Sequence, residues 1–72
     1  MIEYPIVLEQ EVDGRFSVYA PDLPGCSSWG ATRAEAIEHV REAIEVWIES
    51  AKTGGEPIPL PGSALEYVRI AG

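Results

Sequence analysis

Cysteine, histidine and basic residues are scarce in this chain of 72 residues, and each shortage excludes a class of protein. Cys26 is the only cysteine, so no disulfide framework can form. One cysteine and one histidine also supply too few ligands for a metal cluster. Five basic residues against twelve acidic ones leave a formal charge of −7. Because nucleic-acid binding needs a basic surface that neutralises phosphates, direct contact with DNA or RNA is not expected.

Long apolar runs and targeting segments are also missing. No stretch approaches the roughly 20 apolar residues of a membrane span, and the N-terminus lacks the basic flank and apolar core of a signal peptide. A single free cysteine suits a reducing compartment, so we expect a cytoplasmic protein without a membrane partner. Residues 1–72 make one small domain. Because scaffolds of this size without disulfides or metals often gain stability from assembly, we expect a homo-oligomer.

Alternating apolar residues predict a β-hairpin in the first part of the chain. Residues 2–10 and 15–20 alternate, and Asp13-Gly14 between them is a strong hairpin signal. Pro5 cannot donate to a strand ladder, so the first strand should lie at a sheet edge or begin pairing after Pro5.

A dense proline and glycine turn at residues 21–25 follows, and residues 26–29 can form a short third strand. Gly30 permits the next bend. Further along, residues 65–70 can form a last strand, paired within the subunit or with a neighbouring one. The order is β-β-β-α-β, an α+β fold in which an antiparallel-rich sheet is covered on one face by one long helix.

The helix is predicted over residues 34–52, which contain neither glycine nor proline. Thr32 and Glu35 have capping-box spacing, in which the hydroxyl accepts a helix amide and the carboxylate accepts the amide of the cap residue. Gly54 stands where a left-handed C-terminal cap belongs.

Apolar and acidic residues occupy opposite faces of this helix. The apolar stripe comprises Ile37, Val40, Ile44, Trp47, Ile48 and Ala51, with Ala36 and Ala43 alongside. The acidic stripe comprises Glu38, Glu42, Glu45 and Glu49. Like charges spaced four residues apart weaken a helix slightly. The acidic stripe is therefore either a solvated face that aids solubility or a docking surface for a basic partner.

A second candidate surface is the sheet face that no helix covers. Strand alternation places Val7, Tyr19, Trp29 and Tyr67 there. A cluster of aromatic side chains on one uncovered face favours an oligomer or partner interface.

The remaining candidates have structural interpretations. The turn at residues 21–26 fixes a tight connection between strands, with the Asp22 carboxylate turned onto nearby backbone amides. Cys26 lacks a neighbouring base and is predicted to be a small buried core residue. His39 lies off the apolar stripe and is predicted to be solvated. No catalytic residue, metal or cofactor is predicted.

Several motifs are more specific in combination than alone. In order they are Tyr4-Pro5-Ile6-Val7, Asp13-Gly14-Arg15-Phe16, Pro21-Asp22-Leu23-Pro24-Gly25-Cys26, Gly30-Ala31-Thr32, Glu35-Ala36, Glu42-Ala43-Ile44 and Pro57-Ile58-Pro59-Leu60-Pro61. Over roughly residues 4–61 this series resembles the HicB-like antitoxin family.

The resemblance implies a truncated ribonuclease H-like fold and the antitoxin half of a toxin–antitoxin pair. The implied partner is a small basic toxin, HicA-like, which cleaves messenger RNA and whose active surface the antitoxin blocks. Many relatives carry a C-terminal DNA-binding domain, which we do not expect in a chain that stops at Gly72.

The sequence also suggests two other functions. The chain can instead be a stand-alone homo-oligomeric module that binds an unrelated protein or a small ligand. A degenerate metal-dependent nuclease is disfavoured, because Glu3, Glu9 and Glu66 share no focus where divalent ions would bind.

Overall fold

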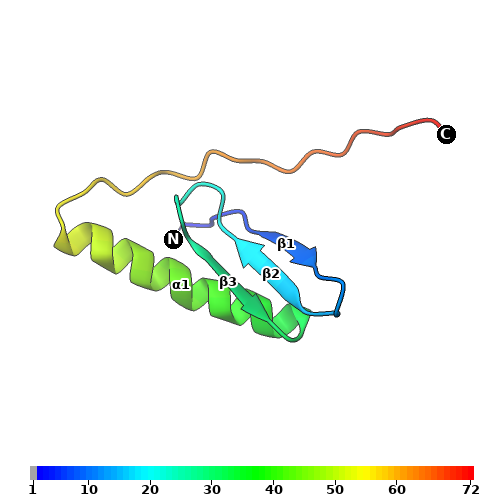
Figure 1. Cartoon of the computed structure of the whole chain (residues 1–72). Helices are drawn as coiled ribbons and strands as arrows, with labels where there is room; N and C mark the ends of the chain where they lie inside the picture. The colour runs from blue at the N-terminus through cyan, green and yellow to red at the C-terminus, as the bar shows by residue number, and fades with distance from the viewer. Residues whose placement is uncertain (1) are drawn as a thin grey trace.

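Three strands and one helix make up the regular structure of the computed structural model, which describes residues 2–72 (Figure 1). The elements are β1 (Val7–Gln10), β2 (Phe16–Tyr19), β3 (Ser27–Gly30) and α1 (Arg33–Thr53). The strands are antiparallel in the order β1-β2-β3, so β2 is central and β1 and β3 lie at the edges. The predicted fold class, α+β with one helix over one sheet face, is confirmed.

The predicted hairpin joins β1 to β2. Val7 pairs with Tyr19, so pairing begins only after Pro5 and β1 lies at an edge, as expected from the missing amide hydrogen. The hairpin loop contains Gly14 with a φ of +92°, a conformation that glycine adopts without steric cost. Strand β1 is shorter than predicted, because residues 2–6 approach the sheet without joining its ladder.

The core lies between β2 and α1, where Val18 packs against Ala36 and Val40. Small residues bring the helix close to the end of β3. A Cβ atom built on Gly30 would lie only 2.7 Å from the Cα atom of Ala36. The φ angle of Gly30 is not positive. Glycine is therefore required at this position by close packing, whereas the sequence had indicated only a bend.

A second core cluster forms under the turn between β2 and β3. Ala20, Leu23 and Cys26 are buried there, and Tyr4 and Trp47 pack against them. The turn is fixed by hydrogen bonds from the Leu23 amide to the Ala20 carbonyl (3.1 Å) and from the Cys26 amide to the Leu23 carbonyl (3.0 Å). The structural interpretations of this turn and of Cys26 are therefore confirmed.

The helix begins at a capped residue, as predicted. The Thr32 hydroxyl accepts a hydrogen bond from the Glu35 amide at 3.1 Å. The reciprocal contact differs from the prediction, because the Glu35 carboxylate accepts from the Ala31 amide (2.8 Å) and not from that of Thr32. The carboxylate thereby ties the helix start to the preceding loop.

The C-terminal cap lies one residue later than predicted. Gly54 is right-handed, with a φ of −81°, and Gly55 adopts the left-handed conformation with a φ of +69°. The Gly55 amide bonds the Lys52 carbonyl and the Glu56 amide bonds the Ala51 carbonyl, which together form a Schellman motif. The prediction of Gly54 as the left-handed residue was wrong because α1 continues to Thr53.

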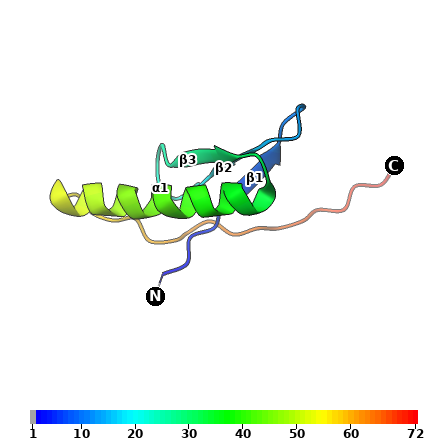
Figure 2. The same ribbon diagram turned by 90° about the horizontal axis from the view of Figure 1, so that it is seen from below.

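The predicted strand over residues 65–70 does not form in the single chain. Residues 56–72 have no regular secondary structure, and the segment runs past the start of β1 and then away from the sheet (Figures 1 and 2). The chain as a whole extends over 49 × 28 × 20 Å. Within residues 2–72, no helix is both long and apolar enough to cross a membrane.

Candidate functional site

The four glutamates of the acidic stripe are all exposed along α1. Only Glu38 has a cationic neighbour within ion-pair distance among the described residues, with Arg41 Nε at 3.7 Å. A pair of this kind, exposed on a helix surface, contributes little to stability. The stripe therefore presents negative charge to solvent along most of the helix.

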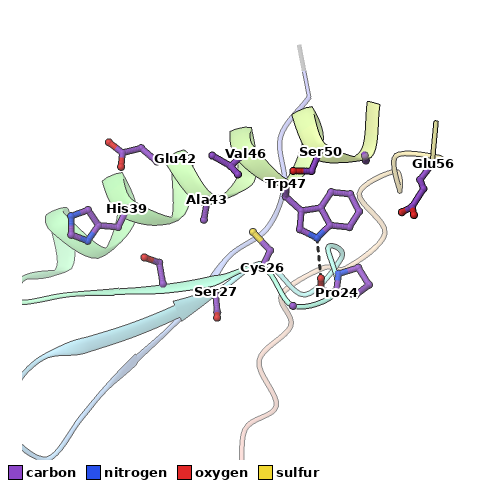
Figure 3. Close-up of a pocket in the computed structure, with 13 residues that line it drawn as sticks. Pro24, Cys26, Ser27, His39, Glu42, Ala43, Val46, Trp47, Ser50 and Glu56 are labelled. Atoms are coloured by element: carbon purple, nitrogen blue, oxygen red, sulfur yellow. Dashed lines mark hydrogen bonds between the residues drawn. The ribbon is translucent and has the colours of Figure 1, made fainter. Parts of the chain in front are cut away.

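Beside this stripe lies a cleft of about 830 Å³. Its walls are formed by α1, by β3 and by the turn that precedes β3. His39 and Trp47 stand at its two ends with Cys26 between them, and Glu42 and Val46 project from the helix along its rim (Figure 3). The Trp47 indole donates to the Pro24 carbonyl at 2.9 Å, which fixes one wall of the cleft. Sequence reasoning missed this cleft, because its walls come from segments about 20 residues apart.

His39 is only partly solvated, because the residue is partly buried and makes a contact that the prediction did not include. Its Nδ1 atom is 2.6 Å from the Trp29 carbonyl oxygen. Because a carbonyl only accepts, Nδ1 carries the proton in this contact. The imidazole also meets the Trp29 ring edge-on, with ring centroids 6.4 Å apart. His39 thus links α1 to the edge strand β3.

The sheet face opposite the helix carries Tyr19 and Trp29, which are 41% and 53% exposed. The guanidinium carbon of Arg15 lies 5.5 Å from the Trp29 ring centroid, at cation–π distance. Val7 pairs with Tyr19 and shares this face. Tyr67 does not lie there. Its predicted position required a last strand in the sheet, and the residue belongs instead to the exposed C-terminal segment.

Asp22 uses its carboxylate over a long sequence distance. It accepts hydrogen bonds from the Ser63 amide (3.1 Å) and the Ser63 hydroxyl (2.7 Å). The hydroxyl contact is the main cause that lowers the pKa of the Asp22 carboxyl below its ordinary value, and the amide contacts act in the same direction. The prediction of backbone amides as partners was correct in kind, but the amide is 41 residues away rather than nearby.

The described residues provide no evident reactive group. Burial raises the pKa of the Cys26 thiol, which disfavours the nucleophilic thiolate. Within residues 2–72, no three histidine, cysteine, aspartate or glutamate side chains are close enough together to hold a metal ion. The chemistry that the structure does present is an acidic helix face, a cleft and exposed aromatic rings. Together they define a small α+β domain whose surfaces are suited to binding.

The comparison with family models identifies the kind of binding domain. A model described as the HicB-like antitoxin of bacterial toxin–antitoxin systems matches residues 4–71. The chain therefore belongs to the HicB-like antitoxin family, as its motifs predicted.

Curated relatives agree with this assignment. A UPF0150 protein of Synechocystis is 45% identical over 56 residues, covering 78% of this chain and 71% of its own length. A UPF0150 protein of Thermoplasma acidophilum is 40% identical, covering 81% and 84%. A protein of Photorhabdus laumondii named Antitoxin HicB 1 is 38% identical over 96% of this chain, but only 45% of that protein is covered.

Solved structures show the same fold. The N-terminal domain of the Burkholderia pseudomallei antitoxin HicB matches with a TM-score of 0.76 and 34% identity, covering 85% of this chain and 72% of that one. The structure of that antitoxin itself matches with a TM-score of 0.78 and 36% identity, covering 89% of this chain and 47% of that one. This chain thus spans about half the length of the HicB antitoxins that it resembles.

Proposed function

We propose that this protein is a non-catalytic antitoxin that binds and masks a small basic toxin of HicA type, which cleaves RNA in the cytoplasm. Membership of the HicB-like antitoxin family is the observation that carries the proposal. The formal charge of −7 supports a basic partner, because complementary potentials favour association and exclude partners of like charge.

The masking would rest on charge and on steric cover. A toxin that acts on RNA needs a basic surface for the phosphates. The carboxylates of the acidic stripe on α1 would bind this basic surface in place of the RNA phosphates. The bulk of the domain would then block access by RNA. Oppositely charged surfaces also speed association at low salt.

The side of α1 that faces β3 is the best candidate for the contact. Glu42 belongs both to the acidic stripe and to the rim of the cleft, and Glu56 adds a second carboxylate at the cleft. Val46 is 66% exposed between them. Apolar surface flanked by carboxylates suits a partner with lysine or arginine beside an apolar side chain. Tyr19 and Trp29 on the outer sheet face offer a second contact surface of aromatic character.

Co-expression with the product of the neighbouring gene tests the proposal. We expect the two proteins to co-elute, and we expect the neighbour to cleave RNA only after it is freed. The double variant Glu42→Lys with Glu45→Lys should bind at least about tenfold more weakly, a loss of about 1.4 kcal/mol. Both glutamates are exposed, so the fold should remain intact.

A matched control separates the stripe from the overall charge. Glu11→Lys with Asp13→Lys makes the same change in net charge at exposed positions in the hairpin loop, away from α1 and from the C-terminal segment. This control should retain most of the affinity. Equal weakening by both double variants would assign the effect to net charge, and unchanged affinity in the stripe variant would exclude the stripe.

The alternative function is a stand-alone homo-oligomeric module. Its support is the exposed apolar C-terminal segment, which favours self-association. A neighbouring product that neither binds this chain nor cleaves RNA would favour this alternative. A third outcome, RNA cleavage by the purified chain with Mg²⁺ or Mn²⁺, would contradict the non-catalytic role. It would also support the ribonuclease H-like relationship that the motif resemblance implies.

A further inference from the structure

The C-terminal segment after Ser63 exposes apolar side chains that a folded chain normally buries. Leu65, Tyr67, Val68 and Ile70 are between 58% and 89% exposed. In an extended chain alternate side chains share a face, so Val68 and Ile70 lie on one side and Tyr67 on the other. The segment thus has the pattern of a strand with an apolar face but has no partner strand among residues 2–72 of its own chain.

Two contacts fix the course of the chain just before this segment. The Tyr4 hydroxyl donates to the Pro59 carbonyl at 2.6 Å, and the Asp22 carboxylate holds both the amide and the hydroxyl of Ser63. Beyond Ser63 the segment leaves the domain, and its end lies far from the helix and the start of β1 in both views (Figures 1 and 2). The direction set by these contacts carries the segment away from its own sheet.

A matching surface lies beside β1. Helix α1 contacts β3 most and β2 less, so the sheet is open on the side of β1, whose outer edge has no partner strand. Where residues 2–6 approach β1, a groove of about 580 Å³ separates them from α1. Its apolar lining comes from both segments and includes Ile2, Tyr4, Ile6, Ile37, Ile44 and Ile48.

We propose that residues 64–72 of a second copy add as a strand to the free edge of β1 and cover this groove. Addition of a strand would satisfy the unpaired backbone groups of the edge, as in other cases of β-augmentation. Tyr67 then stands beside Val7 and Tyr19 on the outer face, while Val68 and Ile70 face Ile6 and the groove.

Symmetry favours a copy of this chain as the occupant. The segment carries one acidic and one basic residue, Glu66 and Arg69, so its side chains add no net charge beside β1. Each copy has one segment to donate and one edge to receive it. In a two-fold dimer each copy therefore donates its segment to the β1 edge of the other, so both segments are buried and both β1 edges are paired.

Measurement of the molecular mass in solution tests whether two copies exchange their C-terminal segments, and its result does not depend on whether a toxin exists. The wild-type chain should be a dimer, and Val68→Asp with Ile70→Asp should give a folded monomer, since both side chains are exposed in the single chain. Val12→Asp, at a fully exposed valine in the hairpin loop, is the matched control and should remain dimeric. A monomeric wild type at every concentration, or a dimer that survives the double variant, would overturn the proposal.

Engineered cysteines distinguish a second copy from closure within one chain. A mixture of chains carrying Tyr67→Cys with chains carrying Val7→Cys should form a disulfide between the two. Cys26 should not compete, because it is buried and burial raises the pKa of its thiol. A chain that carries both substitutions should give covalent dimers. Rapid closure into a disulfide-linked monomer would instead show that the segment folds back on its own β1.

Discussion

Replacement of Gly30 by alanine tests the contact that sets the distance between α1 and the sheet. Gly30 is buried at the end of β3, directly against the first turn of the helix. An added Cβ atom would lie 2.7 Å from the Cα of Ala36 and 2.8 Å from the carbonyl carbon of Glu35. Both are backbone atoms, so no side-chain rotation can relieve the clash and the helix itself must move.

The cost follows from this geometry. Overpacking a tight core typically costs about 1–3 kcal/mol, and we expect about 2–3 kcal/mol because backbone must shift. A domain of 72 residues has a total stability of about 4–11 kcal/mol at roughly 0.05–0.15 kcal/mol per residue. At about 4–8 °C per kcal/mol for a domain of this size, Tm should fall by about 8–24 °C.

Thermal unfolding followed by circular dichroism measures this change, with Gly54→Ala as the control. Gly54 has a right-handed φ of −81°, and its added Cβ would lie 3.4 Å from the Ser50 carbonyl oxygen, an ordinary contact. The control should unfold within a few degrees of the wild type. If Gly30→Ala unfolds at the same temperature as Gly54→Ala, the close approach of α1 to β3 does not contribute to stability and the reasoning fails.

Three further predictions concern single sites. Gly55→Ala should lower stability by about 1–2 kcal/mol through its left-handed conformation alone, because no atom lies within 4 Å of the added Cβ, whereas Gly54→Ala should not. The hydrogen bond from Ser63 to Asp22 lowers the pKa of the Asp22 carboxyl. Its contribution to the stability of the folded chain is therefore complete above the ordinary pKa of 3.8 and is lost as the pH falls through the lowered pKa. Loss of protection of the Ser63 amide at low pH, measured as its exchange rate relative to the unfolded chain at the same pH, would show this loss, and the variant Asp22→Asn should lack this protection at all pH values. Cys26 should react with a thiol reagent more slowly in the folded chain than in urea, since burial raises its pKa, and equal rates would contradict that burial.

Short sequence motifs predicted the hairpin and the helix well, because the turn and cap interactions that form them act between residues close together in the sequence. The Asp13-Gly14 pair predicted the hairpin, and Thr32 predicted the start of the helix, since each acts within three or four residues. Where the exact position depended on helix length, as at Gly54 and Gly55, the prediction missed by one residue. The close contact at Gly30 depends on how α1 packs on β3, which no periodicity encodes.

The candidate site was predictable only where one element contains it. The acidic stripe follows from helical periodicity alone, and the structure exposes all four of its glutamates. The bond between Asp22 and Ser63 spans 41 residues, and the contact between His39 and Trp29 joins two elements. Tyr67 was placed on the sheet by a strand that the single chain does not form. These failures share one cause, which is that partners far apart in sequence leave no local pattern.

The position of α1 leads to a prediction about stoichiometry. Because the helix packs most closely on β3, the acidic rim and its cleft lie on the β3 side, while the open groove lies on the β1 side. The cleft proposed for the toxin and the groove proposed for the second copy share no lining residue, although Glu45 of the acidic stripe lies at the groove, so both can be occupied at once. A dimer joined through its β1 edges would bind two toxins, so light scattering should give a 2:2 complex. The variant Val68→Asp with Ile70→Asp should bind toxin with similar affinity as a 1:1 complex. A loss of toxin binding in that monomeric variant would show that the two surfaces overlap.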